Sequence, residues 1–419
     1  MTRRAVLCVL GLALASGLAL ASGISGDPPP RDDPRAEIHH RDGAPAATGA
    51  PYRWHLPEGF PAPRVPTDNP MSAAKVELGR WLFYDTRLSR DGSMSCATCH
   101  RQDLAFTDGR GRALGVTGEL HPRGAMSLAN VAYAVSLGWD DPDLDRLEDQ
   151  LTTPIFGHDP VEMGLRSREP LVDALRGDWR VALLFAAAFP ADPEPVAFEN
   201  LAFALASFQR TLISGGSAFD RYMYGDDPAA LAPAERRGMR LYFSRRLGCS
   251  ECHGRFTFSG PIQFEGSRDH PPLMHNTGLY NLGPEGAYPE DSWGLMRHTR
   301  RPEDMGKFKA PSLRNIEVTA PYMHDGSVET LGDAIDHYAA GGRTIGSGPY
   351  AGRGADSPRK SEDLTGFTLE PEEKADLLAF LRALTDHAFL EDPRFADPRP
   401  TAERSPQPPE VSPLNGGIH

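Results

Sequence analysis

The sequence predicts an all-α fold in which two similar helical domains pack face to face and are joined near residues 213–226. Apolar residues recur at helical spacing along much of the chain, and strand-like alternation is scarce. A short cysteine motif occurs twice, each time after an amphipathic segment, which indicates an internal repeat. The 42 glycines and 39 prolines among 419 residues predict long loops between the helices.

The two ends of the chain are expected to lie outside the folded part. Residues 1–21 combine an early pair of arginines, an apolar stretch and small residues before position 21, which is typical of a signal peptide for export to the periplasm. A retained membrane anchor is the alternative, because the stretch is almost long enough to span a bilayer. The composition of residues 22–53 and 393–419 predicts a disordered linker and a disordered tail. The intervening chain, roughly 340 residues, suffices for two domains, placed at residues 54–215 and 216–392.

The charge distribution bears on the class of partner. The formal net charge is −13, and lysine and arginine do not cluster with aromatic residues. A nucleic-acid-binding surface needs such basic clusters, so nucleic acid is excluded as an expected partner. No membrane span is expected in the mature chain after residue 21.

Five segments carry apolar residues at intervals of three and four, as amphipathic helices do. Ser72 suits the N-cap of the first segment, and Pro371 suits the first turn of the last. The first and third segments contain similar triplets, Leu-Phe-Tyr and Leu-Tyr-Phe, and each leads into one of the two cysteine motifs. The predicted helices are residues 72–84, 196–212, 232–243, 331–340 and 371–384.

The cysteine motifs carry the strongest chemical signal. They read Cys96-Ala97-Thr98-Cys99-His100 and Cys249-Ser250-Glu251-Cys252-His253, and they use every cysteine except Cys8 of the predicted signal peptide. Two thiols one helical turn apart can bond the two vinyl groups of one haem, and the adjacent histidine can then bind the iron. The motifs therefore predict two covalently bound haem c groups with His100 and His253 as proximal ligands. The alternatives are a zinc ribbon, a thioredoxin-like redox pair and two small disulfides.

The second axial position of each iron decides between electron transfer, which needs both positions filled, and chemistry, which needs one open. The sequence alone leaves the distal ligands open. The candidates are Met94, Met126, Met163, Met274, Met296, Met305, Met323, His121, His158, His275, His298, His324, His337 and Tyr338.

Several sequence blocks resemble the bacterial di-haem cytochrome c peroxidase and MauG superfamily, in the same order and over roughly residues 70–390. Within it, three further blocks look most similar to the MbnH-type enzymes of the methanobactin-associated branch. The superfamily blocks are AFTDG (105–109), Trp139, LEDQ (147–150), PVEMG (160–164), HNTG (275–278), FKAPSLRN (308–315) and TAPYMHDG (319–326). The branch blocks are MSLANVAY (126–133), FGHDPVE (156–162) and IDHYAAGG (335–342).

The resemblance assigns roles to individual positions. Trp139 matches the tryptophan that relays electrons between the two haems. Gln150 and Glu162 match the pair on the distal side of the first haem, where a carboxylate can move a proton between the peroxide oxygens. Tyr338 matches the distal ligand of the second haem in MauG-like proteins, and the neighbouring His337 is a rival ligand.

Two departures from the conventional peroxidases matter. Their removable distal histidine has no counterpart in register here, since His121 lies five residues away, and this implies an open first haem that needs no prior reduction. Their interdomain calcium site uses an asparagine where this chain has Gly124, although Thr319 and Pro321 match the other contributors. The resemblance therefore leaves calcium as an open question.

The resemblance implies a periplasmic oxidoreductase in which peroxide reacts at the first haem. Its oxidising equivalents would then be held as a high-valent state over both irons and passed to a distant tryptophan of a partner protein. One alternative is a peroxide-detoxifying cytochrome c peroxidase supplied by a small electron-donor protein. The second alternative is a non-enzymatic electron-transfer cytochrome with both irons six-coordinate.

Overall fold

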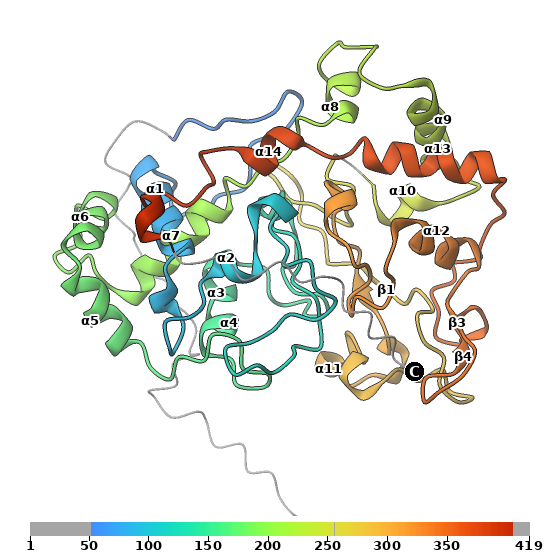
Figure 1. Ribbon diagram of the computed structural model, residues 1–419, viewed down its shortest axis with the longest axis horizontal. Helices are drawn as coiled ribbons and strands as arrows, with labels where there is room; N and C mark the ends of the chain where they lie inside the picture. The colour runs from blue at the N-terminus through green and yellow to red at the C-terminus, as the bar shows by residue number, and fades with distance from the viewer. Residues whose placement is uncertain (1–51, 255, 405–419) are drawn as a thin grey trace, which may run out of the picture. The chain divides into compact units, whose positions relative to one another are not determined.

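The computed structural model describes residues 52–254 and 256–404 (Figure 1). The predicted signal peptide, all but the last two residues of the predicted linker and the end of the predicted tail lie outside the described residues. Among the helices that are described, none combines the length and the apolar character needed to cross a bilayer.

Helices supply most of the regular structure, as predicted, and the strands are only two residues long. β1 (Met274–His275) pairs antiparallel with β2 (Phe308–Lys309), and β3 (Thr344–Ile345) pairs antiparallel with β4 (Gly352–Arg353). The helices are α1 (Ala73–Phe83), α2 (Cys96–Cys99), α3 (Leu147–Gln150), α4 (Thr152–Phe156), α5 (Glu169–Gly177), α6 (Trp179–Ala188), α7 (Phe198–Gln209), α8 (Ala218–Met223), α9 (Pro233–Tyr242), α10 (Cys249–Cys252), α11 (Met296–Thr299), α12 (Leu331–Ala339), α13 (Pro371–Arg382) and α14 (His387–Glu391).

The five predicted helices are present as α1, α7, α9, α12 and α13. Ser72 caps α1 as expected, because its side chain accepts a hydrogen bond from the Lys75 backbone N–H at 3.1 Å. The prediction missed α5 and α6. In α6 the sequence is apolar on nearly every side, with Leu183 exposed and Phe185 buried, so no single helical stripe stands out.

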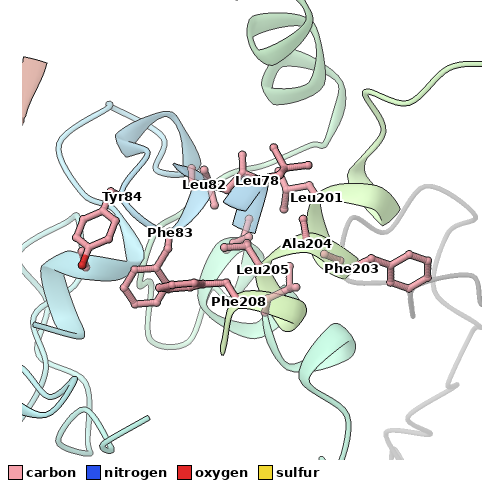
Figure 2. Close-up of a cluster of buried hydrophobic side chains, with 14 of the residues drawn as sticks. Leu78, Leu82, Phe83, Tyr84, Leu201, Phe203, Ala204, Leu205 and Phe208 are labelled. Atoms are coloured by element: carbon pink, nitrogen blue, oxygen red, sulfur yellow. The ribbon is translucent and has the colours of Figure 1, made fainter. Parts of the chain in front are cut away.

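Helices α1 and α7 pack closely through small residues and a layer of apolar side chains (Figure 2). Three side chains of α1 are fully buried in this layer, those of Leu78, Leu82 and Phe83. The centroid of the Phe83 ring lies 5.2 Å from the centroid of the Phe208 ring. Gly79 permits the close approach, because a Cβ there would lie 2.0 Å from the Ala204 carbonyl oxygen.

Helices α9 and α13 repeat this arrangement later in the chain. A Cβ on Gly238 would lie 1.9 Å from the Asp376 carbonyl oxygen, and the Tyr242 ring lies 5.3 Å from that of Phe380. Each helix that leads into a cysteine motif therefore crosses its partner helix at a glycine. The predicted repeat thus extends to the way its first helix is packed.

The buried hydrophobic residues form two large clusters, and Trp139 packs against the second of them. The first draws mainly on residues 78–212 and the second mainly on residues 219–384. The assignment of two domains at residues 54–215 and 216–392, packed face to face, stays a prediction.

The expectation of a disordered tail from residue 393 is wrong as far as Arg404. Phe395 is buried in the first hydrophobic cluster beside Phe389, and its carbonyl oxygen accepts a hydrogen bond from the Tyr84 hydroxyl at 2.7 Å. A short 3₁₀ helix follows at Thr401–Glu403. The burial of this aromatic ring and its backbone contact thus help to order a segment whose composition alone predicted no structure.

Candidate active site

Each cysteine motif forms one turn of helix, α2 or α10, with the histidine directly after it. The four cysteines Cys96, Cys99, Cys249 and Cys252 are free thiols, and burial raises the pKa of each to about 11 or 12. Within residues 52–254 and 256–404, no group of three or more His, Cys, Asp or Glu side chains could hold a metal ion. The disulfide and zinc alternatives gain no support, and the thiols are available for bonds to haem vinyl groups.

His100 and His253, the predicted proximal ligands, are both oriented by backbone carbonyl groups. His100 Nδ1 lies 2.7 Å from the Phe106 carbonyl oxygen, and His253 Nδ1 lies 3.1 Å from that of Pro311 and 3.3 Å from that of Phe258. Burial lowers the pKa of both rings, so both are neutral at pH 7. With Nδ1 donating to a carbonyl, Nε2 carries no proton and is free to bind iron.

Two of the three carbonyls that orient these histidines come from strained positions. Phe106 and Phe258 have φ angles of 63° and 51°, a left-handed conformation that bulky residues rarely adopt. Sequence reasoning missed both residues. The available signal was a phenylalanine followed by Thr or Ser, six residues after His100 and five after His253.

Each haem motif borders a cavity. The first cavity, of about 490 Å³, is lined by Cys96, Cys99 and His100. The second, of about 310 Å³, is lined by Cys249, Cys252 and His253. Both volumes fall in the range of cofactor sites.

Trp139 lines both cavities, together with residues 124–127, Lys309 and Ser312. Its indole Nε1 donates a hydrogen bond to the Gly124 carbonyl oxygen at 2.9 Å, and its own carbonyl oxygen accepts one from the Lys309 backbone N–H at 2.8 Å. These two contacts fix the indole between the two haem motifs, at the position that a relay between them requires.

Gln150 and Glu162 both line the first cavity, where the resemblance expects them. Gln150 ends α3, and Glu162 lies in a loop whose backbone is tied down, since its carbonyl oxygen accepts a hydrogen bond from the Val116 N–H at 2.7 Å. Burial raises the pKa of the Glu162 carboxyl from 4.5 to about 7. A carboxyl with such a pKa can both accept and return a proton near neutral pH.

At the second cavity the structure separates the two rival ligands. Tyr338 lines the cavity, whereas His337 is absent from its described lining and packs edge-on against the Tyr338 ring at 5.1 Å. Burial raises the pKa of the Tyr338 phenol far above its usual value, so an ionised phenolate there would need a cation such as ferric iron beside it. This placement favours Tyr338 as the ligand, and the assignment stays a prediction.

A second repeated motif also went unrecognised in the sequence. Asn130 and Asn315 both end a Ser-Leu-x-Asn sequence and have left-handed φ angles of 63° and 59°. Both side chains bind Ser214: Asn130 Nδ2 donates to its carbonyl oxygen at 2.9 Å, and Asn315 Nδ2 donates to its hydroxyl at 3.0 Å. Through Ser214, the two asparagines thus connect the two Ser-Leu-x-Asn segments.

These residues fit the haem groups that the motifs predict. The donor set consists of paired free thiols, a neutral histidine with one nitrogen available, and a cavity that all three line. The buried Lys309 ammonium, which lines both cavities and donates to the Ser136 carbonyl oxygen at 2.5 Å, offers a positive charge for an acidic group such as a haem propionate.

Comparison with known proteins gives consistent matches. A family model described as di-haem cytochrome c peroxidase matches residues 73–228. The methylamine utilization protein MauG of Methylorubrum extorquens is 36% identical over 79% of this chain and 83% of that protein. The cytochrome-c peroxidase IdrP1 of Pseudomonas sp. strain SCT is 36% identical over 87% of this chain and 93% of that protein. The crystal structure of a MauG-like protein associated with microbial copper homeostasis has a TM-score of 0.81 and 48% identity, covering 83% of this chain and 99% of that chain.

Proposed function

Because the chain belongs to the di-haem cytochrome c peroxidase and MauG family, we propose that it uses hydrogen peroxide to oxidise a partner protein at a distance. Members of this family are haem-dependent oxidoreductases that act on peroxide, and membership implies two haem c groups. They are also periplasmic, and the predicted signal peptide agrees with that location. Calcium, for which Thr319 and Pro321 match two family contributors while Gly124 does not match the third, remains an open question.

The observation that carries this proposal is the position of Trp139. One indole lines both cavities, so an electron could leave the second haem site and reach the first without passing through solvent. A detoxifying peroxidase could use the same relay, but the combination with Tyr338 in the second cavity favours a site that stores oxidising equivalents.

When bound, the haems would supply the redox chemistry, with peroxide entering the first cavity. There Glu162 would accept a proton from one peroxide oxygen and return it to the other as the bond between them breaks. Gln150 would hold the peroxide from the other side of the same cavity through its amide group. Trp139 would pass electrons between the sites, held in place by its hydrogen bond to Gly124.

For the partner, we propose an exported protein with an oxidisable tryptophan. The support comes from the similarity to MbnH-type sequences and to a MauG-like protein linked to copper homeostasis. A small copper-binding protein encoded nearby would be the first candidate.

The second candidate function is peroxide detoxification with a small electron-donor protein. The observation that favours it is the identity of 36% to a cytochrome-c peroxidase, which equals the identity to MauG.

The deciding experiment treats the purified holoprotein with peroxide in the presence of a candidate partner and examines the partner by mass spectrometry. Oxygen addition at one tryptophan supports the proposal. Steady peroxide turnover with reduced cytochrome c and an unmodified partner would support detoxification instead. A ferric EPR spectrum with two low-spin haems and no high-spin signal would contradict both, since neither iron would then be open to peroxide.

A further inference from the structure

His121 lies in the first cavity beside Glu162. Both residues line this cavity, and His121 Nε2 is 3.7 Å from Glu162 Oε1. The resemblance gave His121 no role, because it is out of register with the removable ligand of the conventional peroxidases. Its position in the structure is nevertheless next to the carboxyl on which the proposed peroxide chemistry depends.

The loop that carries His121 is attached to the segment that carries Glu162. It folds back on itself through a bridge between Leu114 and Leu120 and through the hydrogen bond from the His121 N–H to the Ala113 carbonyl oxygen at 2.7 Å. Gly115 lets it lie directly on the neighbouring backbone, since a Cβ there would be 1.9 Å from the Val161 carbonyl oxygen.

The Val116 N–H then donates to the Glu162 carbonyl oxygen at 2.7 Å. The two side chains are therefore held on one rigid unit, and their closeness does not depend on a free loop.

The hydrogen bonding of His121 fixes which ring nitrogen carries the proton. The Arg123 backbone N–H donates to Nδ1 at 3.1 Å, so Nδ1 is an acceptor. A neutral imidazole with Nδ1 as acceptor has its proton on Nε2, the nitrogen that faces Glu162. The ring thus presents an N–H donor to the carboxylate.

Burial, helped by two nearby arginines, keeps the imidazole ring of His121 neutral. Burial is the main cause that lowers the pKa of His121 to about 4, with Arg123 and Arg297 acting in the same direction and Asp140 opposing them. Glu162, with Oε1 at 3.7 Å from Nε2, also faces the ring. At neutral pH His121 is therefore a neutral donor.

We propose that His121 is a positioning residue of the peroxide site, whose Nε2–H donates to Glu162 Oε1 and leaves Oε2 directed at the peroxide. The proposal rests on the proposed function, because Glu162 is the proton carrier there. A separation of 3.7 Å is longer than a hydrogen bond, and such contacts in ligand-free sites commonly tighten once the reactants are bound. His121 keeps its proton throughout, so Glu162 alone takes up and returns the proton of the peroxide.

The test measures the ionisation of Glu162 directly in the holoprotein, independently of turnover. The protonated-carboxyl infrared band is assigned by its loss in Glu162→Gln and is followed against pH. In His121→Leu the midpoint should rise by about one pH unit, because the carboxylate loses a donor. His121→Gln keeps an N–H donor and should stay close to the unaltered protein. His298→Leu is the matched control, since His298 lines the same cavity but faces Asp140 and Asp141 at 3.9 Å.

The rate of peroxide-dependent oxidation is measured for the same variants. His121→Leu should lower peroxide-dependent oxidation on the order of tenfold, as loss of an orienting partner commonly does, with much of the activity recovered in His121→Gln. An unchanged Glu162 midpoint in His121→Leu would overturn the proposal. A changed spin state of the resting ferric protein in that variant would also overturn it, because His121 would then be an iron ligand. Failure of the proposed function looks different: the unaltered protein would not react with peroxide, while the infrared titration could still be read.

Discussion

Replacing Gly238 with alanine tests whether a glycine crossing positions the second haem motif. A Cβ at this position would lie 1.9 Å from the Asp376 carbonyl oxygen and 2.8 Å from Phe380 Cβ. Cβ atoms essentially never approach closer than 3.0 Å, so α9 and α13 would have to separate by about 1.1 Å. The nearest obstacle is backbone and cannot rotate away.

The cost follows from two opposing effects. Overpacking of this kind costs up to about 3 kcal/mol, and the better helix propensity of alanine returns about 1 kcal/mol. We expect Gly238→Ala to lower the free energy of unfolding by about 2 kcal/mol. The matched control is Gly332→Ala in α12, where the nearest atom to the added Cβ is Thr330 Oγ1 at 3.6 Å. This control should raise the free energy of unfolding by up to about 1 kcal/mol.

The assay is urea unfolding of the two holoprotein variants, followed by far-UV circular dichroism and by haem absorption. A shift of α9 should also disturb the second haem, because the Tyr242 hydroxyl at the end of α9 donates to the His253 carbonyl oxygen at 2.5 Å. Equal stabilisation by both substitutions, or an unchanged spectrum of the second haem in Gly238→Ala, would refute the reasoning.

The other predictions concern single residues of the site and the core. Glu162→Gln should retain both haems and lower peroxide-dependent oxidation by about 10²–10⁴-fold, measured by stopped-flow absorption; a normal rate would remove Glu162 from the mechanism. In the unaltered protein this rate should rise with pH up to about 7 and then level, since the base must be ionised. The pKa of Glu162 in the folded protein lies above the ordinary 4.5, so its contribution to the free energy of unfolding is present at low pH and is lost as the pH rises through about 7. Glu162→Gln should abolish this pH dependence, as measured by unfolding at several pH values. Arg314 is fully buried and donates two hydrogen bonds of 2.7 Å to the Asp220 carboxylate. Asp220→Asn should lower the free energy of unfolding, measured with denaturant, by about 3–5 kcal/mol, because it leaves Arg314 without its counter-charge. A loss under about 1 kcal/mol would contradict this. Tyr338→Phe should change the low-spin EPR signal of one haem, whereas an unchanged signal would point to His337.

Much of the fold could be predicted because it depends on local patterns. The five predicted helices correspond to α1, α7, α9, α12 and α13, in which apolar residues recur at helical spacing, and Ser72 caps α1 as expected. Helix α6 lacked such a pattern, whereas α5 has an apolar stripe at Leu171 and Leu175 that the prediction overlooked. The tail through Arg404 is held in part by the burial of Phe395, whose carbonyl oxygen contacts Tyr84, some 300 positions away in the chain. No local pattern reports contacts of that kind.

The same division applies to the site. The predicted haem attachment residues could be named from the sequence because Cys96, Cys99 and His100 lie within about one helical turn, where spacing along the chain sets spacing in the structure. Their role in binding haem stays a prediction. Trp139, Gln150, Glu162 and Tyr338 could be named only through the resemblance, and their roles stay predictions.

The sequence by itself determined the two haem motifs, the helix-rich fold and the family resemblance. The tertiary structure alone decided that one indole borders both cavities and that His121 faces Glu162. It also decided that carbonyl groups of Phe106, Phe258 and Pro311 orient His100 and His253. The physical reason is distance along the chain. Thiols three positions apart are brought together by the helix itself, whereas His121 and Glu162 are 41 residues apart and meet only because Gly115 lets two backbones touch.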